Sequence, residues 1–373
     1  MKHAEKFSGD WKANYMKVKS ILSATCLVLD FITISVFAGE GPGVNGYVRV
    51  GVIETEDRAG ESSKGSALGG KLGYITSEWQ GLSAGLSLYT TQELVDNESG
   101  DFFATDNKGY TLIGEAYVKG SLHNTALKLG RFEIDTPHAD TDDIRMVPNT
   151  FRGVVIKNED FIDTVVSFVF LDEWAGVDAD RPETFEDING DDGVFALGVE
   201  YNGIDDAAMQ AWLYKGRELA SLVYVEGIYE TEQVSIGFQF GVQSDDTVDD
   251  SGPDGDVYGV MASYTVDDII LSAAFNDVSG TVIDGFGGGP YFTSADDHTI
   301  GEIEDQQAVT LGFEYAGIKG LTLGLLHADF DSGSNETDYY IIYEPGEDLV
   351  FELIYTDLHE EGHFVRLMGN YYF

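Results

Sequence analysis

The sequence predicts an all-β fold, a transmembrane antiparallel β-barrel, and three observations support this prediction. Segments of about ten residues with alternating apolar and polar side chains recur from Gly46 to the last residue. No apolar run of roughly 18 residues follows Gly46, so no membrane helix is expected there. Long polar connections alternate with tight turns, the asymmetry typical of outer-membrane barrels.

Composition agrees with strands rather than helices. The 373 residues include 45 glycines and 12% aromatic residues but only 7 prolines, which suits twisted strands joined by hairpins. Barrels reach this length without dividing into two domains, so the length does not require a second domain.

Residues 1–38 have the features of a secretory signal peptide. Lys17 and Lys19 precede an apolar run over 20–38 that ends in Val36-Phe37-Ala38, with small residues where a signal peptidase cleaves. Met16 offers an alternative start. We therefore expect a signal peptide over 1–38 and a barrel domain over 39–373.

Two alternatives apply to this N-terminal run. It could be a transmembrane anchor, although Asp30 interrupts it. It could also carry a lipid on Cys26, although Ser23 stands where a lipoprotein signal has leucine. Cys26 is the only cysteine, so cleavage after Ala38 leaves no disulfide to form.

The mature chain is strongly acidic. Cleavage removes five basic and three acidic residues, which leaves 16 basic and 63 acidic residues and a net charge of −47. Such a chain repels phosphate, so nucleic-acid binding is not expected, and cations are the natural partners. The alternative is that the charge only solvates the loops.

Eighteen strands can be placed by alternation, and sixteen is the alternative count because the seventh and fifteenth alternate poorly. The predicted strands are 45–55, 65–77, 82–92, 109–120, 123–134, 150–158, 162–172, 192–201, 206–215, 219–230, 232–243, 255–265, 268–277, 306–316, 320–330, 337–344, 347–357 and 363–373.

The alternation also predicts which face meets lipid. Outward faces are expected to carry Leu82, Ala84, Leu86 and Leu88 in one strand, Leu112, Gly114, Ala116 and Val118 in another, and Leu349, Phe351, Leu353 and Tyr355 in a third. A soluble sandwich also alternates in this way. The alternating connection lengths favour the barrel.

Tight turns such as Gln80-Gly81 and Val266-Asp267 are expected on the periplasmic side. The long acidic connections are expected as outer loops, and they cover 93–108, 135–149, 173–191, 244–254 and 278–305. A barrel this wide encloses a water-filled passage unless a loop narrows it.

The third long loop is the most distinctive stretch. Pro137 and Pro148 bound a segment with both signs of charge, so we expect it to fold into the lumen and form an electrostatic constriction. The alternative is an exposed outer loop. The predicted constriction residues are Arg131, Asp135, Asp142, Asp143 and Arg145.

Charged residues whose sequence neighbours are apolar are expected to face water in the lumen, because a charge on the lipid face is unfavourable. The predicted pore-lining residues are Arg49, Glu115, Lys119, Lys128, Glu226, Glu352 and Arg366. For the acidic ones, the alternative is a hydrated wall that binds no solute.

The run from Gly130-Arg131 through Asp135-Thr136-Pro137 to Asp142-Asp143-Ile144-Arg145-Met146 and Pro148-Asn149-Thr150-Phe151 resembles the OprD family of outer-membrane porins, especially its epsilonproteobacterial members. Residues 174–178 and 189–194 are similar to that group too. The resemblance spans the mature chain and implies an 18-stranded, often trimeric barrel with an inward third loop. It also implies a ladder of arginines, to which Arg131 and Arg145 correspond.

Other chemistry is less well supported. Asp187, Asn189 and Asp191 have the alternate spacing of calcium ligands, but Asp192 replaces the required glycine and no glutamate closes the loop. No histidine has a nucleophile at a spacing typical of catalysis. An outer-membrane protease or lipase, or a non-conducting structural or adhesive barrel, remains as an alternative.

The expected function is passive diffusion of small hydrophilic solutes, with cations favoured, across the outer membrane of a Gram-negative bacterium. No cofactor is expected. The expected partners are outer-membrane lipid and lipopolysaccharide, a homotrimer, and the barrel assembly machinery, which the aromatic terminus at Phe373 would engage.

Overall fold

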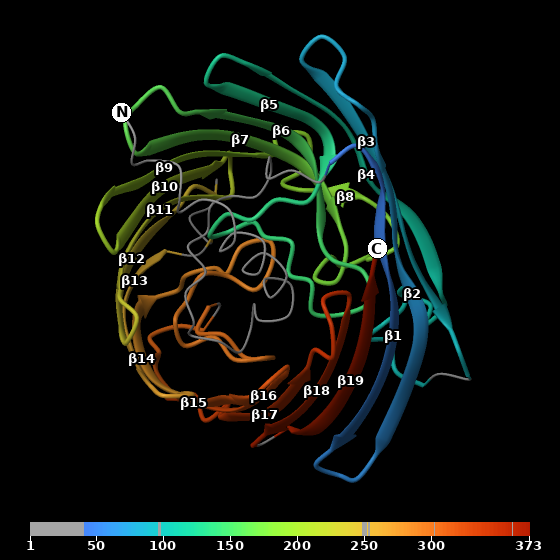
Figure 1. Ribbon diagram of the computed structural model, residues 1–373. Coiled ribbons are helices and arrows are strands. Elements are labelled where there is room, and N and C mark those ends of the chain that lie inside the picture. The colour runs from blue at the N-terminus through green and yellow to red at the C-terminus, as the bar shows by residue number, and fades with distance from the viewer. Residues whose placement is uncertain (1–40, 96–97, 248–251, 253, 302, 360) are drawn as a thin grey trace.

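The strands of the computed structural model close into one antiparallel barrel (Figure 1). The structure describes residues 41–95, 98–247, 252, 254–301, 303–359 and 361–373. The predicted signal peptide, with Met16 and Cys26, lies outside the described residues. No helix in the described part of the chain is long and apolar enough to cross a membrane.

All eighteen predicted strands are present, so the alternative count of sixteen is wrong. A two-residue strand that was not predicted, β8, pairs with β7. The strands are β1 Gly43–Asp57, β2 Ser62–Ile75, β3 Leu82–Glu93, β4 Tyr110–Leu122, β5 Thr125–Phe132, β6 Thr150–Asn158, β7 Thr164–Ala175, β8 Glu186–Asp187, β9 Val194–Ile204, β10 Ala207–Gly216, β11 Ala220–Glu230, β12 Val234–Asp245, β13 Gly255–Val266, β14 Ile269–Gly280, β15 Gln307–Ile318, β16 Leu321–Phe330, β17 Glu336–Tyr343, β18 Leu349–Leu358 and β19 Gly362–Tyr372.

The barrel closes where the first and last strands meet. β1 pairs with β2 on one side and with β19 on the other, so this seam leaves no open sheet edge. Beyond the last paired residues, Gly46 and Phe373 exchange two backbone hydrogen bonds of 3.1 and 3.0 Å. The C-terminal aromatic residue is therefore part of the closure.

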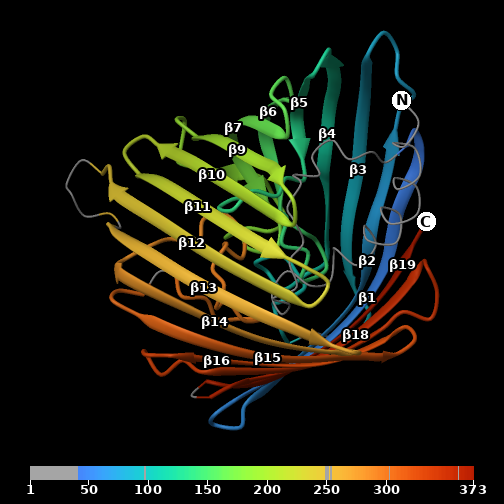
Figure 2. The ribbon, with the colours of Figure 1, turned by 60° about the vertical axis from the view of Figure 1, so that its left-hand side comes forward.

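The strands are tilted (Figure 2), and their outer faces are apolar. In β18, Phe351 is 41% exposed on the outer face, whereas Ile354 is 3% exposed on the inner face. β3 alternates in the same way as predicted, with Leu86 outside and Tyr89 inside. The tilt and the apolar outer face are those of a membrane-spanning barrel.

One face prediction is wrong, and a β-bulge explains the error. In β4, Glu115 is opposite Ser87 and Ile113 is opposite Leu88, so Gly114 is an extra residue in this strand. The bulge shifts the alternation by one residue, which turns Leu112 into the lumen instead of towards lipid. Val118, beyond the bulge, lies outside as predicted.

Connections at the two ends of the barrel differ in length. At one end the strands are joined by tight turns, such as 123–124 after β4 and 267–268 after β13, where Asp267 has a φ of 52°. The predicted long connections lie at the other end. Two of them do not stay outside, because 133–149 and 281–306 fold into the lumen (Figure 1).

Gly324 on β16 provides room for an inward aromatic ring. A Cβ atom at this position would lie 1.8 Å from Cζ of Tyr340, whose hydroxyl donates a 3.1 Å hydrogen bond to Glu314. Gly324→Ala should therefore displace the ring and destabilise the barrel by about 1–3 kcal/mol, the usual cost of overpacking. Urea unfolding in lipid vesicles measures the change.

Gly346 is the matched control, because a Cβ there meets nothing within 4 Å. Gly346→Ala should leave the unfolding midpoint unchanged. An equal midpoint for both variants would contradict the packing argument.

Candidate functional site in the barrel lumen

Loop 133–149, between β5 and β6, reaches across the lumen to the wall at β1. The Arg49 guanidinium binds both carboxylate oxygens of Asp143 at 2.5 and 2.8 Å, and its Nε donates a 2.6 Å bond to Asn370. Arg49 also donates to the backbone carbonyl of Arg145 at 2.5 Å. The inward third loop was predicted, and this paired arginine is its anchor. Arg49 is only 1% exposed, so it holds the loop rather than a solute.

Loop 281–306, between β14 and β15, is a second inward loop. Its Asp296 accepts two hydrogen bonds from Arg366 on β19, at 2.7 and 3.1 Å, and Arg366 lies 3.6 Å from Glu352. The prediction that this segment is only an outer loop is wrong. Polar side chains of the lumen wall stabilise the inward course of this loop. Strand alternation predicts that these side chains face the lumen, but it does not show that they bind a loop.

The two anchors lie on neighbouring strands, because β1 pairs with β19. Both guanidinium groups are buried and each is paired bidentately with a loop carboxylate. Breaking a buried pair leaves an uncompensated charge, which is strongly unfavourable. Arg49 and Arg366 therefore fix both loops to one side of the lumen.

A charged cluster lies on the wall formed by β2 to β5. Lys71 Nζ is 2.9 Å from Glu115 and 3.2 Å from Glu133, and Ser87 donates a 2.7 Å bond to Glu115. Tyr89 also donates to Glu133. Lys71 and Glu133 were not among the predicted site residues. The outward Leu72 beside Lys71 was the signal for an inward lysine.

More lysines continue this inner wall. Lys128 lies 4.2 Å from the ring centroid of Tyr117, and its β4 partner in register is the half-buried Lys119. Lys157 on β6 was not predicted; it is 7% exposed and Glu200 on β9 acts on it electrostatically. The lumen thus carries a basic row, and carboxylates lie beside several of its members.

Loop carboxyl groups form a third cluster near loop 133–149. Burial and the neighbouring Asp178 and Asp140 raise the pKa of Asp142 well above its usual value. Burial, Asp135 and Asp178 raise the pKa of Asp140 in the same way. Asp178 is held by Asn149, whose Nδ2 donates a 2.6 Å bond. Asp140 and Asp142 therefore retain protons that ordinary aspartates lose.

His298 tethers the second loop to the barrel wall. Its Nδ1 lies 3.2 Å from Glu336 at the start of β17, and its Nε2 lies 3.6 Å from Glu361. The backbone N–H groups of Asp297 and His298 also donate to Glu336, at 2.9 and 2.7 Å. The hydrogen bond to Glu336 raises the pKa of His298.

Arg145, in loop 133–149, forms no ion pair with any described residue. Its Cζ is 5.9 Å from the ring centroid of Phe364, and Nη1 is buried without a hydrogen-bond partner. The predicted Asp135 accepts a 3.2 Å bond from the backbone N–H of Thr141 and so shapes the loop. Glu226 faces the lumen, where the hydroxyl of Tyr224 donates to it at 2.8 Å.

The structure does not place Arg131 in the constriction. In β5, Lys128 and Phe132 face inward, so Arg131 has outward parity, and its Cζ lies 4.0 Å from the ring centroid of Phe185. The prediction was wrong because Arg131 lies in strand β5 and not in the loop. Alternate residues of a strand face opposite sides, and this places Arg131 outside.

The weak calcium candidates do not form a cation site with the described residues. Asn189 donates through Nδ2 to the carbonyls of Gly193 and Arg217, at 3.1 and 3.0 Å, and so closes a turn. No group of three or more histidine, cysteine, aspartate or glutamate side chains in the described ranges is placed to hold a metal ion. Asp187 and Asp191 thus lack converging partners there.

Comparisons with known proteins agree with this architecture. Residues 87–290 match the family model described as outer membrane porin, OprD family. No curated protein matches the sequence. Among solved structures, Pseudomonas aeruginosa OccK1 (OpdK) is 16% identical, with a TM-score of 0.76 over 88% of this chain and 98% of that one.

Two further solved structures are similar at the level of the fold. Pseudomonas aeruginosa OpdK with vanillate is 16% identical and has a TM-score of 0.77, covering 88% of this chain and 98% of that chain. Acinetobacter baumannii OccAB2 is 16% identical, with a TM-score of 0.75, and the match covers 88% of this chain and 97% of that one.

Proposed function

This chain belongs to the OprD family of outer membrane porins, and we propose that its lumen favours cations over anions. It is a channel for small solutes in the outer membrane of a Gram-negative bacterium. Solutes diffuse passively through the space that the two inward loops leave open. In this proposal no cofactor takes part and no bond is made or broken.

One observation supports the proposed preference: carboxyl groups in the lumen pair with the basic side chains and outnumber them. Asp143 and Asp296 pair with Arg49 and Arg366, and two glutamates flank Lys71. Further carboxyl groups of the loops and the lumen wall outnumber the remaining lumen lysines and Arg145, and these are Asp135, Glu200, Glu226, Glu314, Glu336 and Glu352. A ring of acidic side chains in a pore selects cations.

Liposome swelling tests this preference with solutes of matched size. Vesicles that contain the protein should swell faster in glycinamide, a cation, than in glycine, and more slowly in acetate. Vesicles without protein supply the leak rate. Faster swelling in acetate than in glycinamide would overturn the cation preference, and no swelling in any solute would overturn the channel itself.

Selectivity should depend on pH because of Asp140 and Asp142. Their raised pKa values mean that both carboxyl groups stay neutral where ordinary aspartates are ionised, and they gain charge as the pH rises through the raised values. Cation selectivity should therefore keep increasing as the pH rises above the range in which ordinary aspartates ionise. The reversal potential in a salt gradient measures it.

The variant Asp140→Asn/Asp142→Asn should flatten this pH dependence. A wild-type reversal potential that falls as the pH rises would contradict the assignment. The same pKa shifts predict weaker docking of loop 133–149 at high pH, because the docked state retains protons that the released state has lost.

We also propose that residues 1–38 are removed on export, that Phe373 engages the barrel assembly machinery, and that the barrel forms a homotrimer. The charged start and small-residue end of the apolar run support the first proposal. The aromatic terminus supports the second, and the family resemblance supports the third. The mass of the mature protein tests the removal of residues 1–38, and its native mass in detergent tests the homotrimer.

A further inference from the structure

The two inward loops are joined to each other by their backbones. Phe286 N donates to His138 O at 3.0 Å, Asp140 N donates to Phe286 O at 2.9 Å, and Ala139 and Phe286 form a parallel β-bridge. The loops start from distant parts of the barrel wall and meet inside the lumen (Figure 1). A two-bond bridge between loops is a specific joint rather than a van der Waals contact.

The side chain of His138 strengthens this joint. It is 4% exposed, and its Nδ1 lies 2.9 Å from the backbone oxygen of Asp284 in the second loop. Burial lowers the pKa of His138 to about 4, so the ring is neutral near neutral pH. A carbonyl oxygen only accepts, so Nδ1 must carry the proton and donate to Asp284.

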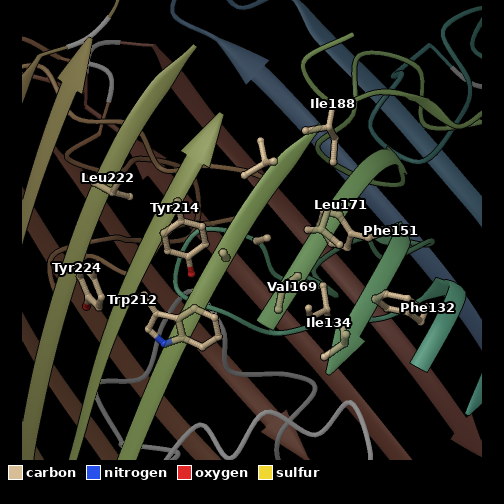
Figure 3. Packing of buried hydrophobic residues seen from close by; sticks show 14 of the residues in the cluster. Phe132, Ile134, Phe151, Val169, Leu171, Ile188, Trp212, Tyr214, Leu222 and Tyr224 are labelled. Carbon is tan, nitrogen blue, oxygen red and sulfur yellow. The ribbon is translucent and has the colours of Figure 1, made fainter. Parts of the chain in front are cut away.

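Aromatic rings hold the imidazole in this orientation. The His138 ring is edge-on to Tyr214, Tyr224 and Tyr291, with centroids 5.3, 5.5 and 6.0 Å away. Tyr214 on β10 and Tyr224 on β11 belong to an apolar cluster that extends from β4 to β11 and includes Ile134 (Figure 3). Tyr291 belongs to loop 281–306. The histidine therefore contacts the barrel wall and the second loop together.

The far contacts of both loops converge on the other side of the lumen. Asp143 binds Arg49 on β1, and Asp296 binds Arg366 on the adjacent β19. Each loop thus has one buried arginine anchor there, His298 also holds loop 281–306 to Glu336 on β17, and the His138 joint connects the two loops. If the joint holds, releasing one anchor leaves both loops held by the other.

We propose that loops 133–149 and 281–306 act as one rigid strut across the lumen, with His138 as the positioning residue that unites them. This inference rests on the proposed channel, because the strut sets the width of its passage. Neither loop then moves away from the wall alone. The width of the passage changes only when both the Arg49–Asp143 and the Arg366–Asp296 anchors are broken.

A disulfide tests the joint without using conductance. Ala139→Cys/Phe286→Cys, in a Cys26→Ser background, should cross-link in the folded barrel, as shown by a mobility shift on gels of unheated and heated protein. The pair Ala139→Cys/Phe292→Cys, with the second cysteine elsewhere in the same loop, should not. Absence of the first cross-link in heat-modifiable protein would overturn the strut.

Conductance then tests whether the loops move as one. Asp143→Asn and Asp296→Asn should each change conductance little. In the double variant, the fold-change in conductance should exceed the product of the two single fold-changes by more than about twofold. His138→Phe keeps a ring but loses the Nδ1 donor. In this background, the fold-change in conductance of the double variant should equal the product of the two single fold-changes. Multiplication in the wild-type background would overturn the strut.

The two proposals fail in different ways. If no variant conducts although the disulfide forms, the channel proposal fails and the joint stands. If the protein conducts but the cysteines do not cross-link, the channel stands and the strut fails.

Discussion

Arg49→Ala will detach the Asp143 end of loop 133–149 from β1 and speed hydrogen exchange there, whereas conductance will change little because the loop stays joined to loop 281–306. The substitution leaves Asp143 without its buried partner, and breaking a buried ion pair from one side costs about 3–5 kcal/mol. The backbone amides of the loop should therefore exchange hydrogen at least about 100-fold faster. Hydrogen exchange and planar-bilayer recording measure both effects.

Arg152→Ala is the matched control. Arg152 also binds an aspartate bidentately, with two 2.7 Å bonds to Asp172, but its side chain is 41% exposed on the outer face. Exposed pairs contribute at most about 1 kcal/mol, so exchange should change less than about fivefold. Unchanged exchange in Arg49→Ala would contradict the anchoring role of Arg49.

Glu115→Gln/Glu133→Gln will remove most of the negative charge beside Lys71 and shift selectivity towards anions. Two unit charges 4 Å apart interact by about 4 kcal/mol at the effective dielectric constant of a protein surface. Even with strong screening by salt, we expect the cation-to-anion permeability ratio to fall by about tenfold. The reversal potential reports the ratio.

Glu159→Gln/Glu232→Gln removes the same charge from two exposed positions on tight turns and is the control. It should leave the permeability ratio unchanged. Lys71→Met should move the ratio in the opposite direction, towards cations. A shift of the same sign in Lys71→Met and in the double glutamine variant would contradict an electrostatic cause.

The strand pattern was predictable because a barrel wall imposes one constraint on every strand: alternate residues meet lipid. That constraint located all eighteen long strands and the lumen positions of Arg49, Lys128 and Arg366. It failed at Leu112, where the extra residue Gly114 shifts the alternation. A bulge depends on hydrogen bonding between two strands, which one strand's sequence does not determine.

The loops were harder to predict, because no periodic constraint acts on them. The inward course of 133–149 followed from its two prolines and mixed charges, but that of 281–306 depends on partners distant in sequence, such as Arg366 for Asp296. The same limit applies to the pairing of Lys71 with Glu133. Arg131 shows the opposite case, since strand parity alone would have excluded it from the constriction.

The reversal potential of the refolded wild-type protein in a potassium chloride gradient tests the central claim most directly. Discrete ohmic channels whose reversal potential has the sign of potassium selectivity are the result expected from carboxylates that exceed the basic row. A reversal potential of the opposite sign would show that the lysines and Arg145 dominate the passage, and it would contradict the proposed cation preference.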